Sequence, residues 1–291
     1  MTEAERNLRF KQRLTEGGAL LLPGVSNALA ARIAQDCGFE VLYLSGAGVT
    51  NTNLGLPDMG LISLPELIDV ITLIRQISDL PLVVDGDTGF GNAMNVRHTV
   101  RRVEAAGANA IQLEDQEFPK RCGHFDGKEV IPAKEMVAKI KAACDARRDP
   151  NFQIMARTDA AAIEGFEAAI ERARLYAEAG ADILFVEAVT TAEQIKAAPA
   201  LINRPLLMNV VLGGKSPALP LSTLDEAGYK LVLYANLALQ ASMYAMQTAL
   251  GDLKTHGAVV DTSRIATFAE RQRLVGKPEF DSLEKKYKVE A

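Results

Sequence analysis

The sequence contains eight short apolar runs that recur along the chain with helix-like segments between them. Each run is almost continuously apolar and rich in Val, Ile and Leu, which is typical of strands covered on both faces in a parallel sheet. The intervening segments repeat apolar residues every three or four positions and close with Gly, as amphipathic helices do. The runs cover residues 19–25, 41–48, 81–87, 110–115, 153–159, 183–189, 205–211 and 230–236.

This alternation predicts an α/β protein, a (β/α)8 barrel of the TIM type, with an open doubly wound sheet as the main alternative. The 291 residues, 48% of them hydrophobic, can bury a large core, and no Ser/Pro-rich linker divides them. We therefore expect one domain over residues 1–291. Residues 237–291 are longer than one closing helix needs, so we expect C-terminal helices that extend beyond the barrel to another subunit. The alternative is an extra helix on the same barrel.

Composition excludes several classes of partner. A net charge of -5, from 37 acidic and 32 basic side chains that are well mixed, argues against general binding of nucleic acid or of anionic membranes. The N-terminus has no apolar signal core and no run approaches the length of a membrane span. Three cysteines favour reduced thiols over a disulfide scaffold, and together these features predict a cytoplasmic protein.

Polar residues stand at the ends of most of the apolar runs. In a barrel these ends meet at one mouth, where active sites of this architecture are built. Solvent exposure alone would predict mixed, lysine-rich polarity there. Most of the polar ends are instead carboxylates, accompanied by one arginine and by amide or hydroxyl groups, which suit a hard metal ion and an anion. These residues are Ser45, Gly46, Asp85, Asp87, Glu114, Asp115, Arg157, Asp159, Glu187, Asn209 and Asn236.

Asp85 and Asp87 form the most specific carboxylate pair. The strand rise predicts that they lie on the same side of one strand, about 7 Å apart. Neighbouring carboxylates repel each other unless a cation or proton lies between them, and with Glu114 from the adjacent strand they would suit Mg²⁺. The alternative is an acidic turn over residues 85–92 that caps the next helix. The G-x-G fragment in this turn lacks the full dinucleotide spacing, so no nucleotide is predicted.

The segment KRCGH, residues 120–124, follows the fourth run and is expected to form a loop over the mouth. Lys120, Arg121 and His124 should favour the thiolate of Cys122, which makes the thiol a competent nucleophile or proton donor near neutral pH. A zinc site would need two more soft ligands, and the other histidines and cysteines fall on helices or in the tail. A protease-like Cys-His pair rarely comes from adjacent residues, and an incidental surface cysteine is the remaining alternative.

Seven motifs occur in order along the chain: YLSGAGV (43–49), GLPDMG (55–60), DGDTGFGN (85–92), IQLEDQ (111–116), KRCGH (120–124), IMARTDA (154–160) and FVEA (185–188). On these motifs the chain resembles the isocitrate lyase and phosphoenolpyruvate mutase superfamily. KRCGH is specific to its carbon-carbon lyase branch, since the phosphonate mutases lack this cysteine. The resemblance implies a (β/α)8 barrel whose last helix is exchanged between subunits of a homotetramer, a dimer of dimers, and an enzyme that uses Mg²⁺ or, as a substitute, Mn²⁺.

The resemblance also implies roles for individual residues. The metal would be surrounded, in part through water, by Asp58, Asp85, Asp87 and Glu114. The substrate would be bound by Ser45, Gly46, Ala47, Gly123, Arg157, Glu187 and Asn209. Tyr43 would lie beside the reacting hydroxyl. The gating loop would be formed by Lys120, Cys122, Gly123 and His124.

The implied reaction is a retro-aldol or Claisen-type cleavage of a 2-hydroxy di- or tricarboxylate into an α-keto acid such as pyruvate and a second carboxylic acid. Cys122 would protonate the enolate that cleavage leaves, with His124 and Arg121 setting its ionisation. The chain length fits the short branch that acts on 2-methylisocitrate, 2,3-dimethylmalate or 2-methylmalate. Leu212 removes a polar contact expected for a tricarboxylate, which favours a smaller dicarboxylate. The alternatives are an oxaloacetate hydrolase or decarboxylase and a catalytically silent barrel that binds a metabolite.

Overall fold

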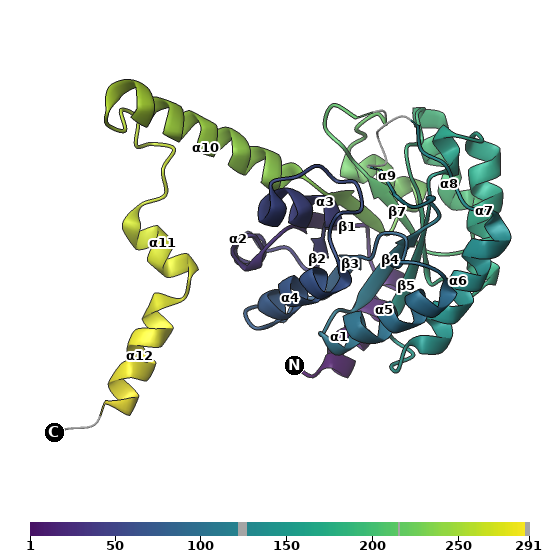
Figure 1. Ribbon diagram of the computed structural model, residues 1–291, viewed down its shortest axis with the longest axis horizontal. Helices are drawn as coiled ribbons and strands as arrows, with labels where there is room; N and C mark the ends of the chain where they lie inside the picture. Colours follow the sequence, from purple (N-terminus) through teal and green to yellow (C-terminus); the bar gives the residue numbers. More distant parts are fainter. Residues whose placement is uncertain (122–126, 215, 289–291) are drawn as a thin grey trace.

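The computed structural model describes residues 1–121, 127–214 and 216–288. In this part of the chain, eight parallel strands form one closed barrel in sequence order (Figure 1). The strands are β1 (Leu20–Val25), β2 (Leu42–Leu44), β3 (Leu82–Asp85), β4 (Ala110–Glu114), β5 (Gln153–Thr158), β6 (Ile183–Val186), β7 (Leu206–Asn209) and β8 (Leu231–Tyr234). Strand β8 closes the barrel, because Leu231 is paired with Leu207 of β7 and with Leu20 of β1. The predicted barrel is confirmed, and the open doubly wound sheet is excluded.

Helices surround the barrel and continue beyond it. The α-helices are α1 (Glu3–Thr15), α2 (Ala28–Asp36), α3 (Gly46–Val49), α4 (Leu64–Arg75), α5 (Ala93–Ala105), α6 (Ala133–Ala146), α7 (Phe166–Glu178), α8 (Ala192–Leu201), α9 (Leu221–Ala227), α10 (Leu237–His256), α11 (Phe268–Leu274) and α12 (Lys277–Tyr287). A π-helix, η1 (Thr50–Leu54), continues α3, and a 3-10 helix, η2 (Ala160–Ala162), follows β5. Among the described residues, no helix has the length and apolar character needed to cross a bilayer.

Side-chain caps fix where several of these helices begin. The Asn92 side chain accepts hydrogen bonds from the backbone N–H groups of Met94 and Asn95 at the start of α5. At α4, the Glu66 carboxylate accepts from the backbone N–H of Ser63. Such caps satisfy backbone donors that have no partner within the helix. They fix the first turn of α4 and of α5.

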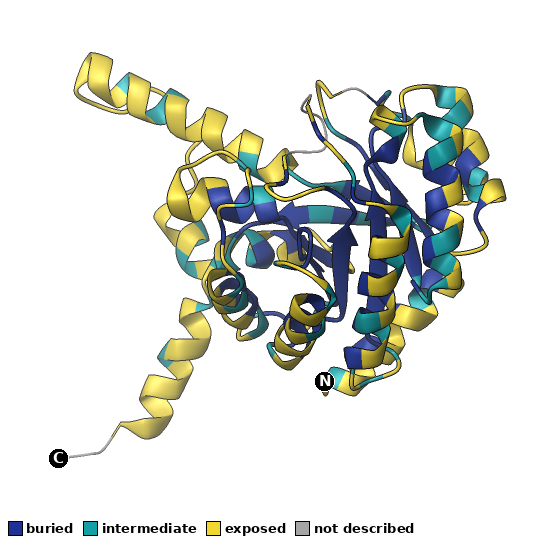
Figure 2. Cartoon of the chain, turned by 45° about the vertical axis from the view of Figure 1, so that its right-hand side comes forward, coloured by how far each residue is buried: buried dark blue, intermediate teal, exposed yellow. Residues whose placement is uncertain are grey.

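The apolar core has two parts, one between the strands and the outer helices and one inside the barrel. The inner part includes Tyr43, Met155 and Phe185, and α1 contributes Phe10 and Leu14 to it. Helix α1 therefore closes the end of the barrel at which the strands begin. The strands are buried on both faces (Figure 2), which explains why their sequences are continuously apolar.

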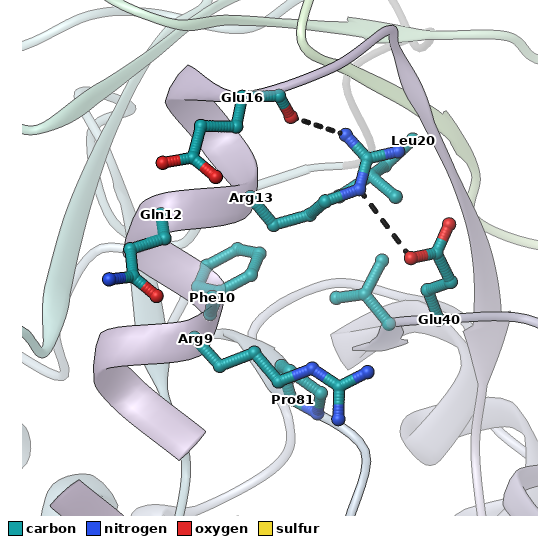
Figure 3. Close-up of a pocket in the computed structure, with 9 residues that line it drawn as sticks. Arg9, Phe10, Gln12, Arg13, Glu16, Leu20, Glu40 and Pro81 are labelled. Carbon is teal, nitrogen blue, oxygen red and sulfur yellow. Dashed lines mark hydrogen bonds and ion pairs between the residues drawn. The ribbon is translucent and has the colours of Figure 1, made fainter. Parts of the chain in front are cut away.

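A cavity of about 200 Å³ lies at this closed end, between α1 and the first residues of the neighbouring strands (Figure 3). Its lining includes Leu20, Val41 and Pro81, each at or just before a strand start. The Arg13 guanidinium crosses it and donates to the Gly18 carbonyl oxygen at 2.9 Å. The carboxyl ends of the strands lie at the opposite end of the barrel, so this cavity is separate from the polar mouth predicted from the sequence.

The strands end earlier than the apolar runs suggest. Strand β2 ends at Leu44, one residue before Ser45, whose hydroxyl caps α3 by accepting from the Gly48 N–H at 3.1 Å. After β3 and β6 the chain turns through left-handed residues, Asp87 with φ 48° and Ala188 with φ 58°. Such φ values are uncommon for residues other than Gly and end strand geometry. Several of the predicted polar residues therefore lie on the turns just beyond the strands.

The C-terminal helices α10, α11 and α12 form an arm that leaves the barrel (Figure 1). None of these three described helices contains a buried residue. Helix α11 touches α2 through Arg273, which donates two hydrogen bonds of 2.7 Å to the Asp36 carboxylate. The expectation that helices extend beyond the barrel is confirmed, and the alternative of an extra helix packed on the same barrel is not what the structure shows. Exchange between subunits stays a prediction.

Candidate active site

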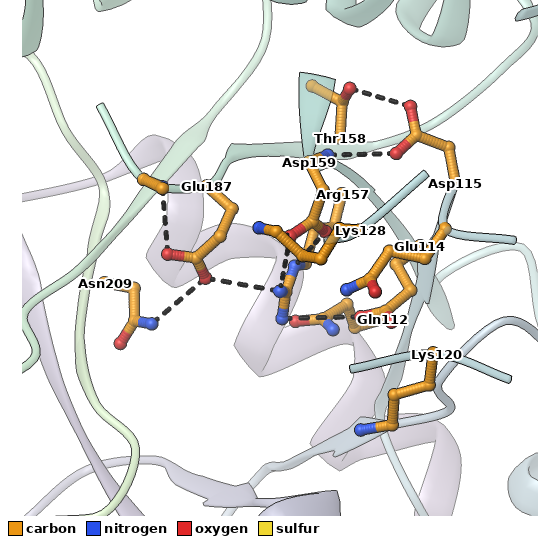
Figure 4. A network of polar contacts seen from close by, with 12 residues as sticks. Gln112, Glu114, Asp115, Lys120, Lys128, Arg157, Thr158, Asp159, Glu187 and Asn209 are labelled. Atoms are coloured by element: carbon orange, nitrogen blue, oxygen red, sulfur yellow. Dashed lines mark hydrogen bonds and ion pairs between the residues drawn. The ribbon is translucent and has the colours of Figure 1, made fainter. Parts of the chain in front are cut away.

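The carboxyl ends of the strands meet at one mouth and bring together most of the predicted polar residues (Figure 4). Burying so many charges at one place is costly unless each is paired or hydrogen-bonded. The buried members of the set are Ser45, Gly46, Asp85, Asp87, Glu114, Lys120, Arg157, Glu187 and Asn209. Ala47 and Asp58 are partly exposed at its edge. The structure therefore brings these predicted residues together.

Asp85, the last residue of β3, has a fixed carboxylate. Its Oδ1 accepts from the Asp87 N–H at 3.2 Å and from Gln112 Nε2 at 3.1 Å, and its Oδ2 accepts from the Gly46 N–H at 3.2 Å. Because Asp87 lies beyond the strand in a left-handed conformation, the expected placement of both carboxylates along one strand face is wrong. The turn instead folds Asp87 back, so that its backbone binds the Asp85 side chain.

Gly46 makes a close backbone approach to these two acids. A Cβ atom at this position would lie 3.2 Å from Asp85 Oδ2 and 3.3 Å from Asp87 Oδ1. Both distances are shorter than an ordinary van der Waals contact. A side chain here would require these carboxylates to shift by a few tenths of an ångström, so the position favours Gly.

Lys120 neutralises part of this acidic group. Its Nζ lies 2.7 Å from Asp87 Oδ1 and also donates to Asp58 Oδ1. Burial opposes the charge on Lys120, but Asp87, Glu114 and the other acids raise its pKa well above the usual value. Burial raises the pKa of Asp87, against the effect of Lys120. The sequence predicted a gating residue at position 120, and the structure shows a buried ammonium between two carboxylates.

Arg157, near the end of β5, is a second buried cation of the mouth. It binds Asp159 through two hydrogen bonds, Nε to Oδ2 at 2.9 Å and Nη2 to Oδ1 at 3.0 Å. Its Nη1 lies 3.4 Å from Glu114 Oε2, and its Nη2 lies 3.6 Å from Glu187 Oε2. Burial opposes its charge, but these three acids raise its pKa well above the usual value.

Glu187 and Asn209 form a polar pair next to Arg157. Asn209 Nδ2 donates to Glu187 Oε2 at 3.2 Å, and Glu187 Oε1 accepts from the Ala188 N–H at 2.9 Å. The remaining polar atom of the pair, Asn209 Oδ1, is buried and has no hydrogen-bond partner among the described residues. An orphaned buried acceptor of this kind suits a donor group on a ligand.

Tyr43 lies inside the barrel and is coupled to the acids through Gln112. Its hydroxyl donates to Gln112 Oε1 at 2.6 Å, and the Gln112 amide donates to Asp85. Burial, and then Asp85, raise the pKa of Tyr43 well above its usual value, which keeps the phenol neutral. Gln112 was not predicted from the sequence, although a polar residue in the middle of an apolar strand indicates a specific hydrogen-bond partner. No site role was predicted for Lys128 or Asp159.

Cys122, Gly123 and His124 lie outside the described residues, so their predicted roles stay predictions. The residues that flank this segment are described. Lys120 binds Asp58 and Asp87, and Lys128 Nζ lies 2.8 Å from Asp159 Oδ1. The described lysines on the two sides of the segment, Lys120 and Lys128, thus each bind a carboxylate of the mouth.

The carboxylate cluster fits a hard divalent cation. Among the described residues, no three His, Cys, Asp or Glu side chains are close enough together to hold a metal ion on their own. Mg²⁺, however, is usually held by only one or two carboxylates and keeps several waters. Glu114 Oε1 is buried without a hydrogen-bond partner, and burial raises the pKa of Glu114 against the effect of Arg157. An oxygen donor in this situation is stabilised by a cation.

The fold and the residues of the mouth together define a (β/α)8 barrel protein with one polar site. The acidic half of the site consists of Asp58, Asp85, Asp87 and Glu114, and the adjoining cationic half is centred on Arg157. Residues 10–254 match the family model described as phosphoenolpyruvate phosphomutase. The chain is 44% identical over 275 residues to 2-methylisocitrate lyase of Aeropyrum pernix, covering 94% of this chain and 88% of the relative. It is 39% identical over 282 residues to 2,3-dimethylmalate lyase of Eubacterium barkeri, covering 96% and 97%. The chain belongs to the phosphoenolpyruvate mutase/isocitrate lyase superfamily.

Solved structures agree with this assignment. Oxaloacetate acetylhydrolase in complex with 3,3-difluorooxalacetate superposes with a TM-score of 0.92 at 32% identity, covering 99% of this chain and 98% of the other. Phosphonopyruvate hydrolase in complex with oxalate and Mg²⁺ superposes with a TM-score of 0.87 at 28% identity, covering 99% of both chains. The relatives named as lyases confirm the prediction of a carbon-carbon lyase, and Mg²⁺ is found in a solved member of the superfamily.

Proposed function

We propose that this protein is a Mg²⁺-dependent carbon-carbon lyase that cleaves a 2-hydroxy dicarboxylate of the 2,3-dimethylmalate type into pyruvate and a second carboxylic acid. The observation that carries the proposal is the 3.4 Å contact between Arg157 Nη1 and Glu114 Oε2. It places a cation that can bind a carboxylate directly beside the acidic cluster that fits a metal ion. A 2-hydroxy acid can chelate a metal through its hydroxyl and carboxylate oxygens, and in such a site it also presents a carboxylate oxygen to Arg157.

The acidic half would hold the metal. Asp58, Asp85, Asp87 and Glu114 would surround it, one or two of them as direct ligands and the others through water. When bound, Mg²⁺ lowers the pKa of a coordinated hydroxyl and polarises the carbonyl that develops from it. Lys120 offsets part of the remaining negative charge of the cluster, so that an anionic substrate can approach.

The cationic and amide groups of the mouth would bind the substrate. Arg157 would bind oxygens next to the reacting carbon, since its guanidinium is buried and matches carboxylate geometry. Glu187 and Asn209 would hold polar groups deeper in the site, where Asn209 Oδ1 has no partner among the described residues. The second carboxylate would lie against Ser45, Gly46 and Ala47.

Cleavage would move electrons as follows. A basic group of the mouth accepts the hydroxyl proton as the oxygen forms the new carbonyl, the adjacent carbon-carbon bond breaks, and its electron pair stays on the carbon next to the second carboxylate. The Cys122 thiol would supply a proton to that carbon, with Arg121 and His124 favouring its ionisation. Tyr43 would position Gln112 and, through it, Asp85. The segment around Cys122 would exclude water from the enolate.

The rim of the barrel also suits a small dicarboxylate. Leu212 is exposed there and lies beside Val210, Tyr234 and Asn236, which gives this edge an apolar wall.

Two further substrates have support from the comparisons. The similarity to 2-methylisocitrate lyase is higher than that to 2,3-dimethylmalate lyase, which makes 2-methylisocitrate the second candidate. The similarity to oxaloacetate acetylhydrolase makes hydrolysis of oxaloacetate the third.

A substrate panel tests the proposal. The protein is incubated with Mg²⁺ and, separately, with 2,3-dimethylmalate, 2-methylmalate, 2-methylisocitrate and oxaloacetate, and pyruvate and oxalate are quantified by chromatography. We expect pyruvate from 2,3-dimethylmalate at a higher kcat/KM than from 2-methylisocitrate. Oxalate from oxaloacetate as the dominant product would identify a hydrolase, and absence of every product would favour a catalytically silent barrel.

We also propose a homotetramer built from dimers that exchange the C-terminal arm, within one barrel domain per chain. The arm carries large apolar side chains that are exposed in the single chain. They include Met243, Tyr244, Met246, Leu250, Leu253, Phe268 and Phe280. Burying these side chains on a second copy would stabilise the assembly. Light scattering of the intact protein would give the mass of the assembly, and a monomer would contradict this proposal. A cytoplasmic location remains a prediction from composition.

A further inference from the structure

Lys128 and Asp159 form a fully buried ion pair that the proposed reaction does not use directly. Lys128 Nζ lies 2.8 Å from Asp159 Oδ1, and the exposed fractions of the two side chains are 2% and 0%. A buried charge is retained at considerable cost and needs close partners. The pair therefore calls for an explanation beyond simple packing.

Asp159 links this lysine to the arginine of the mouth. The same Oδ1 atom accepts from Arg157 Nη2 at 3.0 Å, while Oδ2 accepts from Arg157 Nε at 2.9 Å (Figure 4). The backbone of Asp159 is fixed as well, because its N–H donates to Asp115 Oδ1 at 2.9 Å. Asp115 is held by the Tyr176 hydroxyl at 2.7 Å. Asp159 is thus a rigid platform that orients the guanidinium from one side.

Lys128 reduces the excess of negative charge around Arg157. Besides Asp159, the guanidinium faces Glu114 at 3.4 Å and Glu187 at 3.6 Å, so one positive charge is surrounded by three carboxylates. Interactions between charges at such distances are strong where water is excluded. The ammonium of Lys128 offsets the negative charge of Asp159 and leaves the bidentate geometry in place.

We propose that Lys128 is a positioning residue that acts through Asp159, so that Arg157 keeps its orientation and less of its positive charge toward a carboxylate of the substrate is offset by Asp159. This inference rests on the proposed function only in that the ligand of the mouth is an anionic carboxylate. It adds a role for a residue that itself does not touch the reacting atoms.

Binding of oxalate tests the inference without any turnover. Oxalate is a small dicarboxylate, and titration calorimetry with Mg²⁺ held constant gives its Kd for wild type, Lys128→Met and Lys128→Arg. We expect Lys128→Met to weaken binding about tenfold or more, which corresponds to one lost charge interaction, and Lys128→Arg to stay within about threefold of wild type. Rescue by the charge-conserving variant would not follow from a loss of packing alone.

Lys139→Met is the matched control, because Lys139 is also a buried lysine but donates to the Thr88 carbonyl oxygen at 3.2 Å and lies on α6. It should change the Kd for oxalate less than about threefold. Unchanged oxalate binding in a folded Lys128→Met variant would overturn the proposal. So would failure of the wild type to bind oxalate, because Arg157 would then not face an anionic ligand.

Lys128→Met could fail to fold because it leaves Asp159 buried with one cation fewer. Lys128→Gln keeps an N–H donor for Asp159 and removes only the charge, so it tests the same point without leaving Asp159 short of a hydrogen-bond donor. We expect it to weaken oxalate binding about tenfold, and binding within about threefold of the wild type in this folded variant would overturn the proposal. The substrate panel is a separate measurement, so a wrong substrate assignment and a wrong role for Lys128 would be told apart.

Discussion

The ammonium of Lys120 lies 2.7 Å from the carboxylate of Asp87 in the mouth of the barrel, and the exposed fractions of the two side chains are 4% and 7%. Two buried opposite charges at this distance stabilise each other strongly, and removing one leaves the other uncompensated. The pair also sets how much negative charge the acidic half presents to a metal ion and to an anionic substrate.

Lys120→Met should destabilise the protein and reduce turnover. We expect a loss of about 3–5 kcal/mol in the free energy of unfolding, because Asp87 and Asp58 lose their shared cation. Urea denaturation measures this loss. Added Mg²⁺ should raise the stability of the variant more than that of the wild type, since the metal can replace the missing charge. The exposed Lys134 provides the control Lys134→Met, and equal stability of the two variants would contradict the account.

Gly46→Ala should lower activity with little effect on folding. The new methyl group would lie 3.2 Å from Asp85 Oδ2 and would push the carboxylates apart. We expect kcat/KM to fall about 100-fold, which is the effect of small displacements in an active site. Steady-state kinetics measures this. Gly251→Ala is the control, because a Cβ there meets nothing within 4 Å. Wild-type kinetics for Gly46→Ala would show that the close approach does not matter.

A comparison of Tyr43→Phe with Tyr229→Phe separates the effect of a lost hydroxyl on stability from its effect on catalysis. Removing the hydroxyl leaves Gln112 Oε1 without its 2.6 Å donor, which should cost about 1–3 kcal/mol of stability. Activity should also fall, because Gln112 positions Asp85. Tyr229→Phe makes the same chemical change at a buried hydroxyl that donates to the Ile195 carbonyl oxygen at 2.9 Å, away from the mouth. Denaturation and kinetics of the two variants should show similar losses of stability, with reduced turnover only for Tyr43→Phe. Equal turnover would place Tyr43 outside the mechanism.

Removing divalent cations should abolish activity reversibly. Excess chelator followed by dialysis should leave a folded protein without turnover, and Mg²⁺ or Mn²⁺ should restore it, because the carboxylate cluster supplies hard oxygen ligands. Circular dichroism checks the fold and a keto-acid assay checks turnover. Activity that persists in chelator would indicate a mechanism without a metal.

The architecture and most of the mouth could be predicted from the sequence, because both follow from local patterns. Continuous apolar runs indicate buried parallel strands, and parallel strands bring their carboxyl ends together, which placed Asp85, Glu114 and Arg157 at one site. The geometry of Asp87 could not be predicted, because a φ of 48° depends on the turn and on its bond to Asp85. The continuous apolar pattern of a strand carries no information about the turn that follows it.

The contacts of Lys120 and Lys128 could not be predicted for a different reason. Each lysine binds a carboxylate from another part of the chain, Asp58 or Asp159, and sequence separation gives no distance between them. A lysine in a charged loop sequence is usually solvated, so burial of both was unexpected. Gln112 was the exception, since a polar residue inside a buried strand requires a partner.

The measurement that tests the central claim most directly is cleavage of 2,3-dimethylmalate in deuterium oxide, with both products identified by mass spectrometry. The account predicts pyruvate and propionate in a 1:1 ratio, with one solvent deuterium on the carbon of propionate next to its carboxylate, because bond breaking leaves an enolate that then takes up one hydrogen ion. Pyruvate without propionate, or propionate without deuterium, would contradict it.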